Sequence, residues 1–300
     1  MSRLAPIFVS ASLALSGVAP ALAQAAAEAK PAAAAAATAI APAVAPDDNL
    51  NAVLWTQRAI ERELILQALY RNATEKLDAA IANPKWDALM PEEREVDAAS
   101  LPPAIILDVD EAALDNSSYQ ARLVRSGEEY SEFSWSEWCK ERKARAIPGA
   151  VDFVRAAVAK GVTVYYVSNR ARDLKQATVD NLRTVGFPVP SEEVFLGLGV
   201  VVPGCEQFGS DKTCRRRLVG RKHRVLMQVG DQIGDFVEVV ANTNDGRAEA
   251  MAPYRDWIGE RWWPTPNPNY GSWEPAQFDN YWAQPRAARR KAKIEALRTD

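Results

Sequence analysis

The chain has 300 residues, of which 48% are hydrophobic and 25% are charged, and its formal net charge is −3. A chain of this length and composition can bury a substantial core, which excludes a disordered or fibrous protein. A charge so close to zero gives no electrostatic reason to expect a nucleic-acid or anionic-membrane partner, and we expect no nucleic-acid partner.

The N-terminal region has the pattern of an exported protein. An apolar run that ends at Ala21-Leu22-Ala23 predicts a cleaved signal peptide over residues 1–23. A retained anchor is the weaker alternative, because serine, glycine and proline interrupt a run that barely reaches spanning length. Residues 24–46 are mostly alanine and proline, which predicts a linker. We therefore expect a soluble, exported domain over residues 47–300, with no stable membrane anchor.

Helical and strand patterns then alternate along the chain. Residues 48–82 carry apolar side chains at helical spacing, which predicts one long helix or two. The apolar run 104–109 predicts a strand that is buried on both faces, and residues 119–138 predict an insertion over its end. Further helices are expected at 150–160 and 174–185, and further strands at 162–167, 194–196 and 224–229. This alternation predicts an α/β fold with a parallel sheet and right-handed crossovers.

The C-terminal region is rich in proline and aromatic residues. The prolines between Trp262 and Trp282 predict that no regular structure forms there, so that the rings pack on the core or line a pocket. Core packing is the expectation for four tryptophans, Trp138, Trp262, Trp263 and Trp273. Residues 286–298 predict a basic helix with a solvated face, rather than an arm that binds nucleic acid.

Three cysteines follow the predicted export signal, and an oxidising compartment would favour their pairing. We favour a bridge between Cys205 and Cys214, which would close a small loop. Three reduced thiols, or a pair that includes Cys139, remain open alternatives.

Polar residues with a known use in phosphoryl transfer follow the predicted strands. In chain order they are Asp108 and Asp110, Ser168 and Asn169, Lys212, and Asp231 with Asp235. The carboxyl ends of parallel strands lie on one edge of a sheet, so these residues are expected to meet there. Taken singly, the two aspartates would be an acidic turn, Ser168 a helix cap and Lys212 a solvated residue. A solvated basic stretch is also the expectation for Arg170, Arg215, Arg216 and Arg217.

The order of these motifs is similar to that of the haloacid dehalogenase-like (HAD) phosphatases. Five further stretches, 48–55, 114–117, 146–151, 167–170 and 268–274, resemble the class C acid phosphatases, the bacterial lipoprotein 5′-nucleotidase family. The resemblance covers about residues 48 to 298. It implies a HAD-like Rossmann-type parallel sheet flanked by helices. It also implies a small, mostly helical cap formed by the N-terminal helix, the insertion after the first strand and the C-terminal segment.

The resemblance also implies a role for each motif residue. Asp108 would be the nucleophile that forms an aspartyl-phosphate, and Asp110 would be the acid and base. Phosphate binding would fall to Ser168, Asn169 and Lys212, and stacking on a nucleoside base to Trp135 and Tyr270. The ligands of a Mg²⁺ ion would be Asp108, the backbone carbonyl of Asp110, Asp231 and Asp235. His223 is the only histidine, which excludes histidine phosphatases and sites with several imidazole ligands, and it is expected to be structural.

Three departures from the family pattern qualify these expectations. Ala112 replaces a threonine whose hydroxyl would support the loop that aims Asp110, and Gln232 replaces an asparagine. No lipobox cysteine follows Leu15-Ser16-Gly17, so a soluble periplasmic protein is expected in place of a lipoprotein. The leading hypothesis is a Mg²⁺-dependent phosphomonoesterase for nucleoside 5′-monophosphates, with a homodimer as an option. The alternatives are a catalytically impaired nucleotide-binding or surface interaction protein, and a broad phosphomonoesterase without nucleotide preference.

Overall fold

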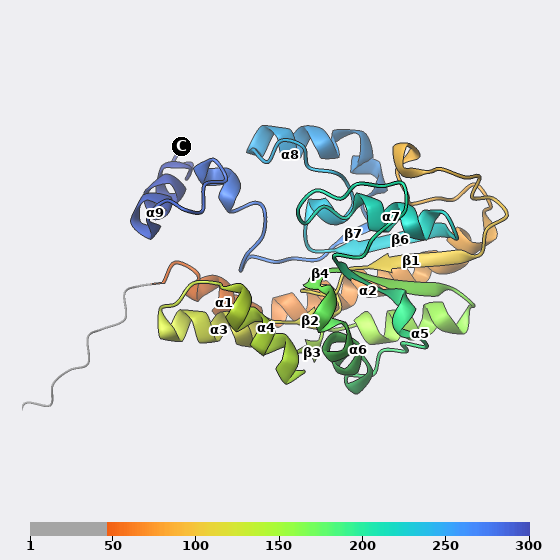
Figure 1. Cartoon of the computed structure of the whole chain (residues 1–300), viewed down its shortest axis with the longest axis horizontal. Coiled ribbons are helices and arrows are strands. Elements are labelled where there is room, and N and C mark those ends of the chain that lie inside the picture. Colours follow the sequence, from red (N-terminus) through yellow and green to blue (C-terminus); the bar gives the residue numbers. More distant parts are fainter. Residues whose placement is uncertain (1–46) are drawn as a thin grey trace, which may run out of the picture. The chain divides into compact units, whose positions relative to one another are not determined.

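A computed structural model describes residues 47–300, so the predicted signal peptide and linker lie outside the described residues. The centre of the domain is a five-stranded sheet with the order β5-β4-β1-β6-β7 (Figure 1). Every neighbouring pair of strands in it is parallel, as the alternation of helices and strands predicts. The strands are β1 (Pro103–Leu107), β4 (Thr163–Ala171), β5 (Phe195–Leu198), β6 (Arg224–Gly230) and β7 (Trp262–Pro264).

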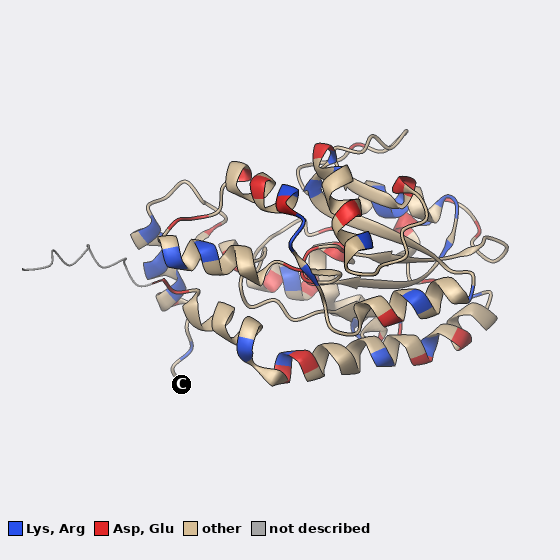
Figure 2. Ribbon diagram, turned by 90° about the horizontal axis from the view of Figure 1, so that it is seen from below, with Lys and Arg blue, Asp and Glu red and all other residues tan. Residues whose placement is uncertain are grey.

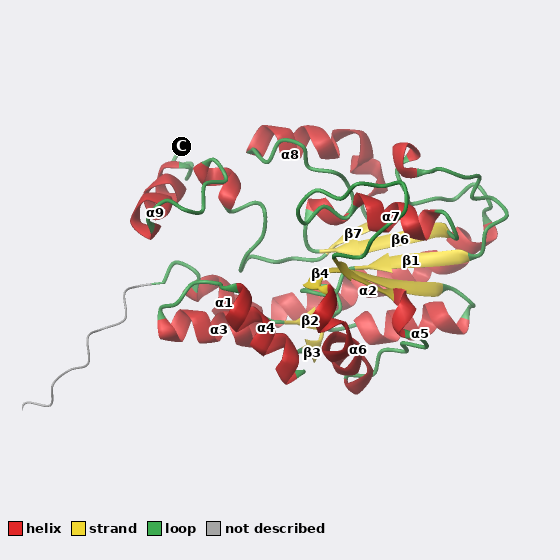
Figure 3. Ribbon diagram, viewed as in Figure 1, coloured by secondary structure: helices red, strands yellow, loops and turns green. Residues whose placement is uncertain are grey.

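Helices cover both faces of this sheet (Figure 3). The α-helices of the described residues are α1 (Leu50–Arg58), α2 (Ile60–Ala82), α3 (Ser117–Ser126), α4 (Glu132–Glu141), α5 (Ala150–Ala159), α6 (Lys175–Thr184), α7 (Thr213–Gly220), α8 (Asn244–Met251) and α9 (Arg286–Glu295). Short 3-10 turns lie at η1 (Pro91–Glu93), η2 (Arg172–Leu174), η3 (Glu192–Val194), η4 (Ile233–Asp235), η5 (Ala252–Trp257) and η6 (Pro275–Phe278). Within the described part of the chain, no helix is both long and apolar enough to cross a membrane.

The side chains of β1 alternate between two cores. Ile105 and Leu107 pack with buried residues of α2, α5 and α6 on one face of the sheet. Ala104 and Ile106 pack on the other face, in a cluster that includes Val219 of α7. Burial of each Ile or Leu side chain contributes about 1.5–3 kcal/mol, so β1 is fixed from both sides. The positions of the residues that follow β1 are fixed with it.

A small helical cap lies beside one end of the sheet (Figure 1). It contains α1, which contacts α3, and the insertion with α3 and α4. Two short antiparallel strands, β2 (Leu114–Asp115) and β3 (Arg145–Ala146), bring the ends of this insertion together. The basic helix α9 (Figure 2) reaches the start of α1 through ion pairs of Arg286 with Asp47 (2.7 Å) and Arg290 with Asp48 (2.9 Å). The cap therefore combines the three predicted segments.

Three local features refine or correct the predictions. Residues 48–82, expected to form one long helix or two, form two helices, because Ala59 between them is extended, with φ −76° and ψ 121°. The prediction of no regular structure after Trp262 was wrong at its start, since β7 pairs with β6 as an edge strand. Proline is tolerated at strand ends and edges, and Pro264 is the last residue of β7. The favoured disulfide between Cys205 and Cys214 is confirmed, and Cys139 is free and buried.

Candidate active site

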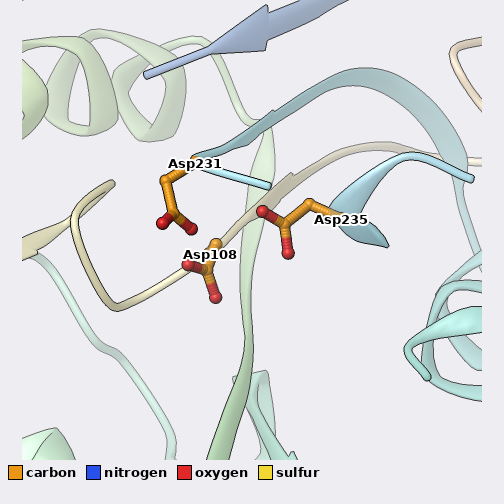
Figure 4. Close-up of side chains that lie close together, drawn as sticks. All are labelled: Asp108, Asp231 and Asp235. Carbon is orange, nitrogen blue, oxygen red and sulfur yellow. The ribbon is translucent and has the colours of Figure 1, made fainter. Parts of the chain in front are cut away.

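Three carboxylates meet at the carboxyl ends of the two central strands (Figure 4). Asp108 follows β1, and its backbone N–H donates to the carbonyl of Val229 in β6 at 2.8 Å. Asp231 follows β6, and Asp235 ends the turn η4. One ligand oxygen from each of the three lies within 4.8 Å of the others. The two motifs are 123 positions apart in the sequence, and the parallel pairing of β1 with β6 brings them together.

The turn between Asp231 and Asp235 brings the side chain of Asp235 close to the backbone of Gly230. A Cβ atom at this position would lie 2.2 Å from Oδ2 of Asp235, which excludes any larger residue without rearrangement. The same Oδ2 accepts a hydrogen bond from the backbone N–H of Gln232 at 2.9 Å. The Gly-Asp-x-x-x-Asp motif is thus a compact turn that directs two carboxylates at Asp108.

Lys212 supplies the positive charge that faces this cluster. Its Nζ lies 2.5 Å from Oδ1 of Asp108 and 2.6 Å from Oδ1 of Asp235. Only 5% of Lys212 is exposed. Burial opposes the charged form, but Asp108 and Asp235 outweigh it and raise the pKa of Lys212 above its usual value. Lys212 is therefore an ammonium group in the folded protein.

This cluster has more carboxyl groups than cationic groups, and a divalent cation would neutralise the excess negative charge. If all three were ionised, Asp108, Asp231 and Asp235 would face one ammonium, leaving a formal charge of −2. Burial and the nearby Asp235 raise the pKa of Asp231 to about 8, although Asn267 and Gln232 donate hydrogen bonds to it. An all-oxygen set with excess negative charge is suited to a hard divalent metal ion. The residues present therefore fit the metal that the fold implies.

Asp110 lies beside this cluster and is held by three donors. Its Oδ1 accepts from Nε of Arg170 at 2.9 Å and from Nδ2 of Asn116 at 3.0 Å. Its Oδ2 accepts from Oγ of Ser168 at 3.2 Å. The strand expected to end at residue 167 continues to Ala171, so Ser168 and Asn169 lie within β4 and do not follow it. Ser168 is fully buried, whereas Asn169 next to it is exposed and its Oδ1 accepts from Arg215 at 2.7 Å. The carboxylate of Asp110 thus has a fixed orientation.

The expectation of a solvated basic stretch was wrong for three of its four arginines. Arg170, Arg215 and Arg216 are at most 1% exposed, and each has acceptors inside the fold. Arg170 pairs with Asp110, Arg215 donates to the carbonyl of Ser168 at 2.6 Å, and Arg216 pairs with Glu93. A buried guanidinium needs such partners, because an unpaired buried charge is strongly unfavourable. For Arg170, the sequence did contain an indication of a buried site residue, because it ends the Val-Ser-Asn-Arg motif at residues 167–170.

One cleft of about 1720 Å³ connects the predicted site residues. Of these residues it is lined by Asp108, Asp110, Trp135, Asn169, Lys212, Asp231, Asp235 and Tyr270, while Ser168 is buried behind them. Trp135 lies with the guanidinium of Arg170 over its ring, 5.4 Å from the ring centroid. Tyr270 donates from its hydroxyl to Glu111 at 3.3 Å. The rings therefore share the cleft with the carboxylates.

The remaining tryptophans separate into buried and exposed rings. Trp138, Trp262 and Trp263 are at most 2% exposed, as expected of core residues. The same expectation was wrong for Trp273, which is 38% exposed and lines the cleft. Its indole N–H donates to the carbonyl of Tyr270, three residues earlier, so local chain geometry holds this ring at the surface. His223 packs its ring against Tyr165, in keeping with a structural role.

The two unusual residues have defined surroundings. Ala112 is fully buried, and its carbonyl accepts from the hydroxyl of Tyr70 at 2.6 Å. The donors to Asp110 come from other residues, so the side chain at position 112 does not hold that carboxylate. Gln232 donates to Asp231 at 2.7 Å and accepts from the backbone of Ser272 at 3.0 Å. The longer amide thus links a carboxylate of the cluster to the loop after Tyr270.

A parallel sheet with Asp-x-Asp after its first strand and Gly-Asp-x-x-x-Asp after a neighbouring strand defines a HAD-like phosphatase. A family model described as HAD superfamily, subfamily IIIB (acid phosphatase), matches residues 18–273. The class C acid phosphatase from Bacillus anthracis is similar at 33% identity and a TM-score of 0.71, over 84% of this chain and 97% of that one. Its structure with tungstate bound gives 33% identity and a TM-score of 0.73, over 85% and 99%.

This chain therefore belongs to the subfamily IIIB acid phosphatases of the HAD superfamily. Membership supports phosphomonoester hydrolysis as its activity. It also accounts for the acidic cluster, since HAD enzymes generally use a divalent metal ion.

Proposed function

We propose that this protein is a Mg²⁺-dependent acid phosphatase that hydrolyses nucleoside 5′-monophosphates through an aspartyl-phosphate. The observation that carries the proposal is the convergence of Asp108 with Lys212, Asp231 and Asp235 at the floor of one cleft. A nucleophile, a cation for phosphoryl oxygens and metal ligands are the components that phosphoryl transfer requires.

In the first step, a carboxylate oxygen of Asp108 attacks phosphorus and the bond from phosphorus to the ester oxygen breaks. Asp110 gives its proton to the departing oxygen, so the alcohol leaves neutral. In the second step, Asp110 takes a proton from water, and that water displaces phosphate from Asp108. Lys212 binds the phosphoryl oxygens as a point charge, and the hydroxyl of Ser168 turns from Oδ2 of Asp110 to donate a directed hydrogen bond to one of them. Asn169, exposed in the cleft, extends this binding surface.

Asp108, Asp231, Asp235 and the backbone carbonyl of Asp110 are the groups that would hold Mg²⁺. When bound, the ion supplies positive charge to the transferring phosphoryl group and offsets the excess of carboxylates. The crowding of carboxyl groups around Asp231, which raises its pKa, supports this assignment.

A nucleoside base is the proposed occupant of the space between Trp135 and Tyr270. Both rings line the cleft that contains Asp108. Arg170 covers one face of Trp135, so a base can stack only on the other face. Stacking gives affinity for many bases because every base has a π-face.

Phosphate release from a panel of esters tests the proposal directly. The wild type should release phosphate from AMP with Mg²⁺ and not with a chelator, and tungstate should inhibit as a mimic of phosphate. Asp108→Asn should abolish turnover while the protein remains folded, because Lys212 keeps its ion pair with Asp235. Asp87→Asn is the control, because Asp87 pairs with Arg94 and does not line the cleft. Full activity of Asp108→Asn would contradict the mechanism, and equal turnover of AMP and simple alkyl phosphates would contradict the nucleotide preference.

The rival function is a nucleotide-binding protein with impaired catalysis, suggested by Ala112. The three donors to Asp110 argue against it, because none of them is residue 112. AMP binding without phosphate release in the presence of Mg²⁺ would establish the rival.

We also propose export and release into the periplasm as a soluble protein, on the pattern of residues 1–23. N-terminal sequencing of the protein recovered from the periplasmic fraction tests this. A chain that retains Met1, or that sediments with membranes, would refute it.

A further inference from the structure

Asn116 is a fully buried residue in the cap, between β2 and α3, to which the mechanism has so far given no part. Its side-chain amide makes four hydrogen bonds. Nδ2 donates to Oδ1 of Asp110 at 3.0 Å and to the carbonyl of Leu114 at 3.3 Å. Oδ1 accepts from Nε1 of Trp138 at 2.8 Å and from Arg170 at 3.1 Å. No polar atom of this buried amide lacks a partner.

The orientation of the amide follows from the chemistry of its neighbours. An indole N–H and a guanidinium group are donors only, so the atom that faces Trp138 and Arg170 must be the amide oxygen. The NH₂ group therefore faces Asp110. If the amide rotated by 180°, its NH₂ group would face the N–H donors of Trp138 and Arg170, and its oxygen would face the Asp110 carboxylate. Trp138 is 2% exposed and Arg170 is 1% exposed, so water does not reach these bonds readily.

This arrangement distinguishes the two oxygens of Asp110. Oδ1 accepts from both Arg170 and Asn116, and it is occupied on two sides. Oδ2 accepts only from Ser168, whose hydroxyl oxygen itself accepts from the backbone N–H of Arg170 at 3.0 Å. The Asp110 side chain keeps 16% exposure and lines the cleft. Oδ2 is therefore the oxygen that is left to exchange a proton with a molecule in the cleft.

The backbone around Asp110 is held by separate contacts, so the amide is not needed to close the loop. The next residue, Glu111, has a left-handed backbone with φ 61°, and its N–H donates to the carbonyl of Leu114 at 2.8 Å. Glu111 in turn accepts from the backbone N–H of Asn116 at 3.0 Å. Apart from its bond to the carbonyl of Leu114, the side chain of Asn116 contacts only the side chains of Asp110, Trp138 and Arg170.

We propose that Asn116 is a positioning residue for proton transfer: its amide, locked by Trp138 and Arg170, holds Oδ1 of Asp110 so that Oδ2 exchanges the proton with the substrate. The inference rests on the proposed function, in which Asp110 is the acid. A residue of the cap would then contribute to the chemical step, together with the residues at the edge of the sheet.

The test compares aryl phosphates of similar shape whose leaving groups differ in their need for a proton. 4-Nitrophenolate departs readily without protonation, whereas phenolate depends on an acid. The parameter is kcat/KM, because it covers the steps through leaving-group departure and does not include hydrolysis of the aspartyl-phosphate. Asn116→Asp keeps the acceptor for Trp138 and Arg170 and replaces the donor to Asp110 with a carboxylate oxygen.

Asn116→Asp should lower kcat/KM for phenyl phosphate by about 30-fold or more, a part of the roughly 10²–10⁴-fold that a positioned acid contributes. For 4-nitrophenyl phosphate, kcat/KM should fall by no more than about fivefold, because its leaving group departs with little need for a proton from the acid. Asn181→Asp is the matched control. Asn181 is 1% exposed, and its amide bonds both backbone groups of Ala144, away from the cleft. It should change the two esters equally.

Trp138→Phe provides a second variant in case Asn116→Asp does not fold. It removes the indole donor that locks the amide and leaves Asp110 untouched, and it should shift the ratio of the two esters in the same direction. Equal losses on both esters in an active enzyme would overturn the role of Asn116 and leave the proposed function intact. A wild type that cleaves no phosphomonoester would overturn both.

Discussion

Replacement of Lys212 by methionine should destabilise the fold and lower activity, and both losses follow from the same two contacts. The Nζ atom lies 2.5 Å from Asp108 and 2.6 Å from Asp235, and the side chain is 5% exposed. Methionine fills a similar volume without the charge. The variant therefore leaves Asp108, Asp231 and Asp235 clustered with no cation among them.

The size of the effect can be worked from these distances. At an effective dielectric constant of about 20, one pair at this separation has a gross attraction of roughly 6–7 kcal/mol, most of which offsets the cost of burial. Loss of one partner of a buried pair typically costs about 3–5 kcal/mol. For a domain of this size, that corresponds to a decrease in Tm of roughly 6–20 °C. In kcat/KM we expect a loss of about 10²–10³-fold, as for other groups that stabilise transition-state charge.

The assay is thermal and urea unfolding of the purified protein with chelator and with Mg²⁺, alongside phosphate release. Mg²⁺ should restore more stability to Lys212→Met than to the wild type, because the ion neutralises the carboxylates that the lysine no longer pairs. Lys76→Met is the control, since its ion pair with Glu260 is exposed and such pairs contribute about 0–1 kcal/mol. A Lys212→Met protein with wild-type stability in chelator would refute the charge argument.

Three further predictions concern other parts of the domain. In chelator, the free energy of unfolding should fall as pH rises from about 4 to about 8. Burial raises the pKa of Asp231 to about 8, so the folded state binds that proton more tightly than the unfolded state. Urea midpoints that do not change over this range would contradict it. Trp135→Ala should lower kcat/KM for AMP by roughly 5- to 150-fold, the value of about 1–3 kcal/mol for a stacked base, and leave small alkyl phosphates unchanged. An equal loss of kcat/KM on AMP and on alkyl phosphates would contradict stacking of the base on Trp135. Reduction of the bond between Cys205 and Cys214, nine positions apart, should cost roughly 2–3 kcal/mol by loop entropy. Identical urea midpoints with and without reductant would contradict that estimate.

The sequence by itself determined the sheet and the order of the site motifs. Apolar runs such as residues 105–107 are typical of strands buried on both faces, as in parallel sheets covered by helices, and the strands found are parallel. Polar residues placed directly after such strands must share one edge, which brought Asp108 and Asp231 together as predicted. Both inferences depend on local pattern and chain direction, which a sequence displays directly.

Only the tertiary structure decided which charged residues are buried and what they contact. Arg170 and Asp110 are 60 positions apart, and nothing in the local pattern distinguishes a buried guanidinium from a solvated one. The roles of Asn116 and Trp138 likewise depend on packing of the cap against the end of β4. Burial of a charge is favourable only when its partners are in place, and those partners come from distant segments. For this reason the sequence predicted the carboxylates, and the fold revealed the groups that hold them.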